Sequence, residues 1–270
     1  MKTHIVFFLF IYNVILCCSQ TNEIVHLKDV DIYYESYGEG SPLVLLHGFT
    51  QTHADWYHLI DSLSSHYQLI IPDLRGHGQS TNPAHKFTCK QSAIDIYSLL
   101  DHLDINKFKA IGYSAGGLTL LHMALMDTSR LEAMVLIGTA PYFPKSSRNV
   151  LKDYTYETLN KATRDYYLKI HPRGEKQVRE LLHQLNGFSE SYNDINFTAP
   201  MLSTIRTKTL IIQGDRDILF PVETALELYR SIPNAYLWIA PNYGHDLISA
   251  SPVWHTPFIN ILNNFFYKPH

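Results

Sequence analysis

The segment FKAIGYSAGG, residues 108–117, decides the fold of this chain. Its apolar start, residues 108–111, is typical of a short strand that is buried on both faces of a sheet. A helical pattern of apolar residues begins at Gly117. Between the two lies G-x-S-x-G with Ser114 at its centre, and its small flanking residues permit a tight turn. The segment therefore predicts a strand, a sharp turn and a helix, with Ser114 at the carboxyl end of the strand.

Apolar runs of the same kind recur along the chain and alternate with segments that have helical spacing. The runs that predict further strands are residues 43–46, 69–71, 134–137, 207–212 and 235–239. An alternating pattern at residues 24–26 and 32–37 predicts a half-buried hairpin before them. We therefore expect an α/β fold with a mostly parallel, eight-stranded sheet, flanked on both faces by helices that cross over with the right-handed sense.

One stretch interrupts this alternation. In residues 142–202, Tyr, Lys, Arg and Glu alternate with leucines, and no buried-strand run occurs. The pattern predicts a small helical cap inserted into a core made of residues 22–141 and 203–270. A chain of 270 residues is long enough for one large core with such an insertion.

Overall charge limits the classes of partner. A formal net charge of -3 provides no extended field for nucleic acid or anionic lipid, so a small neutral or mixed substrate fits better. The sequence shows neither metal-ligand spacing nor a phosphate-binding loop, and we therefore expect no cofactor and no metal.

The first 19 residues have the layout of a signal peptide. Lys2 precedes an apolar run at residues 5–16, and small residues follow it. A membrane-spanning helix needs about 20 apolar residues, so export is favoured over a membrane span. Cleavage near Ser19 and lipoprotein processing with acylation of Cys18 are both open, and the expected location is periplasmic or secreted. Removal of this segment leaves Cys89 without a disulfide partner in the chain.

A serine hydroxyl becomes a good nucleophile only when a base removes its proton, and imidazole suits this task near neutral pH. His245 directly follows the apolar run at residues 235–239, which places it at the same sheet edge as Ser114. His122, His255 and His270 lie on or beyond helical segments and are assigned to packing or surface roles. His77, in a glycine-flanked turn, is the other contender for the base.

The acid that orients the base should come from another strand end. Asp215 and Asp217 both follow the run at residues 207–212. Asp215 stands beside a glycine and is expected to cap its own turn, whereas Asp217 lies further along the loop and can reach the histidine. The preceding strand end, residues 138–140, offers no carboxylate. We therefore predict Asp217 as the orienting acid.

Developing negative charge on a substrate oxygen needs hydrogen-bond donors. The backbone amide of Ala115, at the start of the helix, can supply one. The amide of Phe49, which follows His47 and Gly48 after the strand at residues 43–46, can supply the other. These two amides are the predicted oxyanion hole.

With these residues in place, the chain resembles the α/β-hydrolase family, of the kind that bears a cap and has serine, acid and histidine in that order. The stretch DLRGHGQS, residues 73–80, is similar to the family's D-x-R-G-x-G-x-S turn. Because that turn is usually structural in the family, the resemblance disfavours His77 as the base. Dehalogenases and epoxide hydrolases of this fold use aspartate at the position of Ser114, and the resemblance therefore disfavours both.

The resemblance implies a serine hydrolase, a carboxylesterase above all, that forms an acyl-enzyme on Ser114. Hydrolysis of an amide, a lactone, a thioester or a carbon-carbon bond by the same residues stays open. A non-catalytic ligand-binding protein of this fold is the third alternative. Selection of the substrate is expected to lie in the cap, whose aromatic residues either line a pocket or pack the cap onto the core.

Overall fold

The computed structural model describes residues 20–246 and 248–267. The predicted signal peptide, and with it Cys18, lies outside the described residues. The strands are β1 (Gln20–His26), β2 (Asp31–Tyr37), β3 (Ser41–Leu46), β4 (Tyr67–Pro72), β5 (Phe108–Tyr113), β6 (Leu131–Ile137), β7 (Lys208–Gly214) and β8 (Ala235–Ala240). They form one eight-stranded sheet in the order β1-β2-β4-β3-β5-β6-β7-β8. The strands β3 to β8 are parallel, and β2 pairs antiparallel with both β1 and β4. The predicted α/β fold is confirmed.

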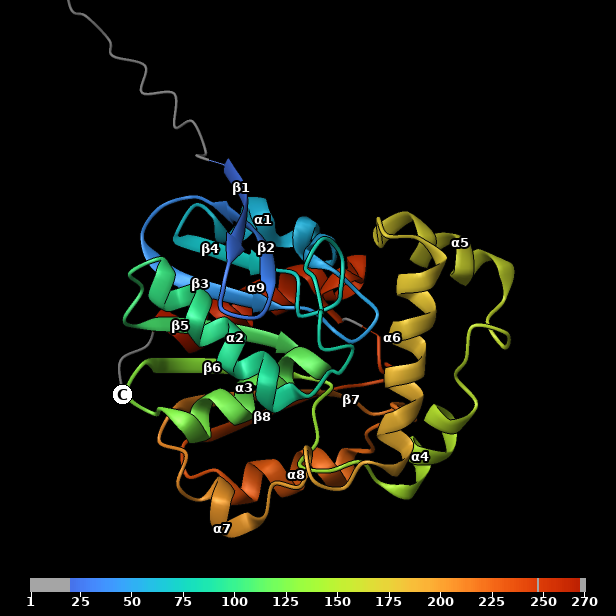
Figure 1. Ribbon diagram of the computed structural model, residues 1–270. Coiled ribbons are helices and arrows are strands. Elements are labelled where there is room, and N and C mark those ends of the chain that lie inside the picture. Colours follow the sequence, from blue (N-terminus) through green and yellow to red (C-terminus); the bar gives the residue numbers. More distant parts are fainter. Residues whose placement is uncertain (1–19, 247, 268–270) are drawn as a thin grey trace, which may run out of the picture.

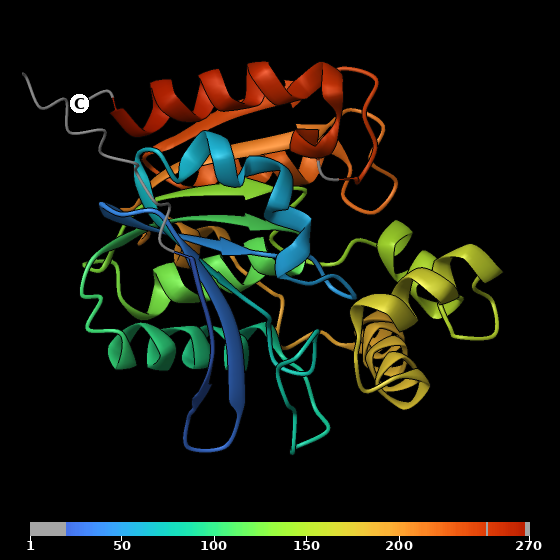
Figure 2. The same cartoon turned by 90° about the horizontal axis from the view of Figure 1, so that it is seen from above.

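Helices cover both faces of the sheet. The α-helices of the described residues are α1 (Ile60–Leu63), α2 (Cys89–His102), α3 (Ala115–Met126), α4 (Lys145–Lys152), α5 (Lys161–Ile170), α6 (Glu175–Gly187), α7 (Ala199–Leu202), α8 (Val222–Ser231) and α9 (Pro252–Tyr267). Figure 2 shows α9 and α1 on one side of the sheet and α2 and α3 on the other. This arrangement makes a layered molecule with a core on each face of the sheet.

Consecutive side chains of the central strands enter different cores, as the period of two in a strand requires. On β3, Val44 and Leu46 pack among the residues that face α2 and α3. Leu43 and Leu45 pack on the opposite face with residues such as Trp56. All four β3 side chains are fully buried, which explains why this strand reads as a continuous apolar run.

Residues 142–202, the cap segment, contain α4, α5 and α6 and a small apolar cluster of their own that includes Tyr156 and Val178. Figure 1 shows these helices beyond the arrowheads of the parallel strands. An isolated antiparallel bridge between Tyr142 and Asn196 brings the two ends of the segment together at its base. The division of the chain into core and cap as separate units stays a prediction.

Two further features concern the described ranges. Cys89 is buried and is not part of a disulfide. Among the helices of residues 20–246 and 248–267, none is long and apolar enough to cross a bilayer.

Candidate active site

Ser114 occupies a sharp turn between β5 and α3. Its backbone angles, φ 50° and ψ -113°, lie in a region that costs a non-glycine residue about 1–3 kcal/mol. The turn is possible because neighbouring segments pass very close. A Cβ atom at Gly116 would lie 2.1 Å from the main-chain oxygen of Leu46, and one at Gly117 would lie 1.9 Å from Oγ1 of Thr139. The small residues around Ser114 are therefore a steric requirement.

The three residues predicted from the sequence meet at one point. Nε2 of His245 lies 3.0 Å from Oγ of Ser114, and Nδ1 of His245 lies 2.8 Å from Oδ2 of Asp217. The carboxylate can only accept a hydrogen bond, so Nδ1 carries the proton and Nε2 is free to accept the proton of Ser114. The Asp217 side chain is fully buried, whereas His245 keeps 16% of its side-chain surface exposed.

Asp217 is held in place by donors on both of its oxygens. Oδ1 accepts hydrogen bonds from the main-chain N–H groups of Leu219 and Phe220. Oδ2 accepts from Nε2 of Gln213 at 2.7 Å in addition to His245. Donors on both oxygens fix the orientation of this buried carboxylate.

The role expected for Asp215 needs correction. Instead of capping its own turn, its Oδ1 accepts a hydrogen bond from the main-chain N–H of Tyr243, at 3.3 Å, on the loop that carries His245. It is Asp217 whose carboxylate caps the following turn, through Leu219 and Phe220. Of the two carboxylates, only Asp217 contacts the imidazole.

Two supporting residues were missed by the sequence reasoning. Gln213, near the end of β7, bridges Asp217 and the main-chain oxygen of Phe220. Tyr113, the residue before Ser114, donates a hydrogen bond from its hydroxyl to the main-chain oxygen of His245 at 2.9 Å. A polar residue buried at the end of a parallel strand was the available signal for Gln213. For Tyr113, the pattern gave no indication because its partner is 132 residues away.

Phe49 and Ala115 both line the space in front of Ser114. Within the described part of the chain, the main-chain N–H of neither residue donates to another protein group. Amides in the first turn of a helix have no partner within the helix, which accounts for Ala115. These N–H groups are thus available to an oxygen placed next to Ser114.

The loop after Phe49 is tied to the cap segment. Thr50 has a left-handed backbone, φ 65°, and its Oγ1 lies 3.0 Å from the hydroxyl of Tyr167 on α5. His171, at the end of α5, accepts a hydrogen bond from the N–H of Gly78 on Nδ1 and donates from Nε2 to the main-chain oxygen of Thr50. Burial lowers the pKa of His171 to about 4, which keeps the ring neutral in this bridging role.

The other histidines lie away from Ser114. His77 is completely buried, packs edge-on against Phe49, and contacts the main-chain oxygen of Arg75 through Nδ1. Burial lowers the pKa of His77 well below its usual value. His122 and His255 each contact a main-chain oxygen on another segment. His270 lies outside the described residues.

Two cavities meet at Ser114. The larger, about 190 Å³, also touches His245 and Tyr113, and the smaller, about 40 Å³, touches Ala115 and the phenylalanines Phe143, Phe188 and Phe220. A third cavity of about 260 Å³ lies elsewhere, between the turn near Gly76 and α6, and has none of the three hydrogen-bonded residues in its wall. Among the described residues, no group of three His, Cys, Asp or Glu side chains could hold a metal ion.

Tyr154, Tyr167 and Phe188 of the predicted cap aromatics line these cavities. Tyr156 instead packs within the cap segment, and Tyr166 is 43% exposed. Three of these five aromatic residues therefore line a cavity, whereas Tyr156 packs inside the cap segment instead of onto the core.

Comparison with known proteins agrees on the fold, whereas the matched proteins differ in activity and include an epoxide hydrolase, a class that the sequence disfavours. The sequence profile of the alpha/beta hydrolase fold matches residues 41–165. A soluble epoxide hydrolase of Corynebacterium sp. (strain C12) is 32% identical over 125 residues, which are 45% of this chain and 44% of that enzyme. A pimeloyl-[acyl-carrier protein] methyl ester esterase of Nitrosomonas europaea is 26% identical over 245 residues, 79% of this chain and 92% of the relative. The crystallised meta-cleavage product hydrolase of Pseudomonas fluorescens IP01 superposes with a TM-score of 0.71 at 24% identity, covering 88% of this chain and 94% of that one.

Proposed function

Because this chain has the α/β-hydrolase fold, we propose that it is a serine hydrolase that cleaves a small carboxylic ester through an acyl-enzyme on Ser114. Its relatives support hydrolase activity, and the esterase that matches most of the chain favours an ester bond. The observation that carries the proposal is the chain of hydrogen bonds from Ser114 through His245 to Asp217. These hydrogen bonds allow the hydroxyl proton of Ser114 to move to the imidazole of His245, while the buried carboxylate of Asp217 stabilises the resulting positive charge.

The proposed reaction has two halves. First, Oγ of Ser114 attacks the ester carbonyl carbon as Nε2 of His245 takes its proton. The carbonyl oxygen then bears negative charge and accepts hydrogen bonds from the amides of Phe49 and Ala115, each worth about 2.7–4 kcal/mol in the transition state. His245 gives the proton to the departing alcohol. Water, deprotonated by the same histidine, then releases the acid and restores Ser114.

A fluorophosphonate probe tests the nucleophile. We expect the purified protein to be labelled at Ser114 and to hydrolyse p-nitrophenyl acetate, because this serine has a base in hydrogen-bond contact. Ser114→Ala should lose both properties while keeping the unfolding temperature within a few degrees of the wild type. A folded wild-type sample with neither labelling nor turnover would refute the enzyme function and favour a ligand-binding protein.

The kind of bond is tested on the same protein. Amide, lactone and thioester analogues, and a substrate with a cleavable carbon-carbon bond, are compared with the ester. We expect the highest kcat/KM for the open-chain ester, because the esterase relative matches most of the chain and because an alcohol protonated by His245 leaves more readily than an amine or a carbanion. A higher kcat/KM for any of the other bonds would replace the ester assignment and retain the nucleophile.

We also propose that the protein is exported and that residues 1–19 are removed as a signal peptide. The charged and apolar pattern of this segment supports the proposal. Mass spectrometry of the mature N-terminus distinguishes the two processing routes. A free terminus at Gln20 indicates ordinary cleavage, an acylated Cys18 indicates a lipid anchor, and an intact Met1 contradicts export with cleavage.

A further inference from the structure

The two cavities at Ser114 can be assigned to the two halves of an ester, the alcohol and the acyl chain. This assignment rests on the proposed function. His245 must protonate the departing alcohol, so the alcohol has to lie on the side of the imidazole. The larger cavity is the one that touches His245. The smaller cavity touches Ala115, one of the two proposed oxyanion donors, and does not have His245 in its wall, whereas Phe49, the other donor, lines both cavities. The acyl chain therefore belongs in the smaller cavity.

The acyl cavity is short and apolar. Its volume of about 40 Å³ is about a fifth of the 190 Å³ of the larger cavity and about a quarter of the roughly 150 Å³ of an engineered cavity that holds benzene, so it suits an acyl group of only a few carbons. Buried phenylalanine rings form part of its wall, with Phe143 lying 5.5 Å from Phe188 and 5.7 Å from Phe220 between ring centroids. Longer chains would have to displace buried rings, which costs about 1–3 kcal/mol or more.

The alcohol cavity is larger and carries polar groups on one wall. The hydroxyls of Tyr154 and Tyr167 lie 3.0 Å apart, and Thr50 and Gln51 line the same space. Val150 of α4 adds apolar surface to the lining. Such a cavity fits an alcohol that has both an apolar surface and hydrogen-bonding groups.

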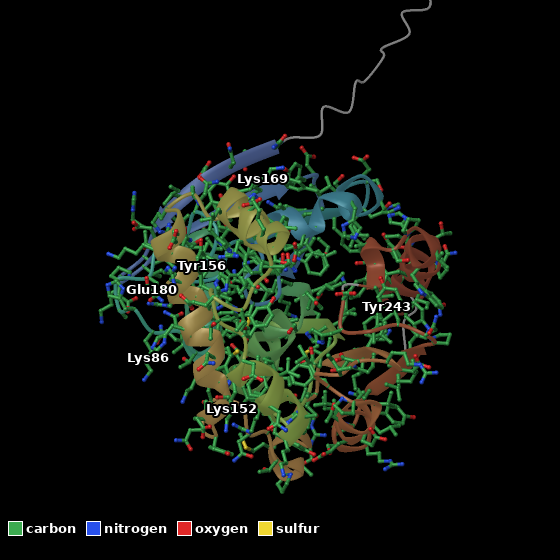
Figure 3. All side chains as sticks on the ribbon, turned by 90° about the vertical axis from the view of Figure 1, so that its right-hand side faces the viewer. Lys86, Lys152, Tyr156, Lys169, Glu180 and Tyr243 are labelled. Atoms are coloured by element: carbon green, nitrogen blue, oxygen red, sulfur yellow. The ribbon has the colours of Figure 1, made fainter. Side chains whose placement is uncertain are left out.

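Neither cavity offers a partner for a charged substrate. Of the described residues that line them, none is Lys, Arg, Asp or Glu. Two of the three cations on α4 have partners elsewhere. Arg148 donates to the main-chain oxygens of Phe143 and Ser189, and Lys152 pairs with Glu190. Figure 3 shows Lys152 labelled at the periphery of this face of the molecule.

We propose that the substrate is an ester of an uncharged acid of about two to four carbons with a larger, uncharged alcohol that carries hydrogen-bonding groups. Burying an unpaired carboxylate beside the phenylalanines would be strongly unfavourable, since no cation compensates the lost hydration. The selectivity thus follows from the small volume of the acyl cavity and from the lack of Lys, Arg, Asp and Glu among the described residues that line the two cavities.

The test compares p-nitrophenyl acetate, butyrate and octanoate with mono(p-nitrophenyl) succinate, which matches butyrate in chain length and adds one carboxylate. We expect kcat/KM for octanoate to be at least tenfold below that for butyrate, and for the succinate at least a hundredfold below. Equal or higher kcat/KM for octanoate or for the succinate overturns the inference. Loss of all turnover and of fluorophosphonate labelling instead overturns the proposed function.

Variants test the cavity itself. Phe143→Ala is expected to lengthen the acyl cavity and to raise the octanoate-to-butyrate ratio at least tenfold. Tyr192→Ala is the matched control on the cap segment, because Tyr192 is 60% exposed and lines neither cavity, and it should keep the wild-type ratio. If Phe143→Ala does not fold, Phe143→Leu serves as the milder variant. An unchanged ratio in a folded Phe143 variant contradicts the inference.

Discussion

Replacement of Asp217 by asparagine is the sharpest test of the site. Main-chain N–H groups point at Oδ1, and His245 and Gln213 donate to Oδ2. An asparagine amide has to present its own N–H₂ group to one of these pairs of donors. The main-chain donors cannot change, whereas His245 can shift its proton, so that only the Nε2 group of Gln213, which also donates to the main-chain oxygen of Phe220, still faces the new amide as a donor. The amide nitrogen of the new asparagine therefore takes the place of Oδ2.

This orientation changes the tautomer of His245. Nδ1 becomes an acceptor, and Nε2 carries the proton and can no longer accept one from Ser114. The loss of kcat expected for a wrong tautomer is about 10⁴-fold, or about 5 kcal/mol of transition-state stabilisation. Substrate binding should be nearly unchanged because Asp217 lines neither cavity at Ser114.

The assay is steady-state hydrolysis of p-nitrophenyl acetate, with Asp215→Asn as the matched control. Asp215 makes one hydrogen bond to the N–H of Tyr243 through an oxygen that asparagine retains. We expect this control within about twofold of wild-type kcat, as for substitutions that cost no more than about 0.5 kcal/mol. Near-normal turnover of Asp217→Asn together with inactive Asp215→Asn would reverse the assignment of the acid.

Three further predictions concern stability and are measured by thermal or urea unfolding. Gly116→Ala should severely destabilise the fold because its Cβ would lie 2.1 Å from a main-chain oxygen of β3, whereas Gly187→Ala, with open space around it, should stabilise by roughly 0.4–1 kcal/mol. The reverse order would contradict the steric account of the nucleophile turn. Arg75→Ala should lower the free energy of unfolding by about 3–5 kcal/mol, because the buried Asp95 loses its hydrogen bonds of 2.7 and 2.8 Å to the guanidinium. A decrease below about 1 kcal/mol would argue against a structural role for the turn at residues 73–80. Burial raises the pKa of Asp55 from 3.8 to about 7. The contribution of protonated Asp55 to the free energy of unfolding is therefore fully present below about pH 4 and is lost as the pH rises through 7. Asp55→Asn should therefore gain stability relative to wild type between about pH 4 and pH 8, and a constant difference would contradict the shift.

Features that depend on residues close together along the chain were predictable from the sequence. The buried strands appear as apolar runs because both faces of the sheet are covered. The turn at Ser114 appears as a motif because only small residues fit where α3 passes β3. Chain order and the positions of strand ends then indicate that Ser114, Asp217 and His245 share one edge of the sheet.

Contacts between distant segments were not predictable in the same way. Tyr113 reaches the loop of His245, and His171 reaches the loop of Thr50, across more than a hundred residues. A pattern within one segment does not encode the partner of such a side chain. The choice between Asp215 and Asp217 rested on reach along the loop, although the turn-capping reason offered for Asp215 does not apply in the folded protein.

The bridge from His171 to Thr50 has a consequence for changing the specificity of this protein. Thr50 directly follows Phe49, so a shift of α5 would alter both the alcohol cavity and the position of the Phe49 amide, a proposed oxyanion donor. Substitutions on α5 should therefore change kcat and KM together. Val150 of α4 lines the alcohol cavity. The described cap residues that hydrogen-bond to Thr50 or Gln51 are instead Tyr166 and Tyr167 of α5 and the following His171. Directed evolution toward new alcohols should consequently begin at Val150, because Ser147 and Leu151 of the same helix also line the acyl cavity.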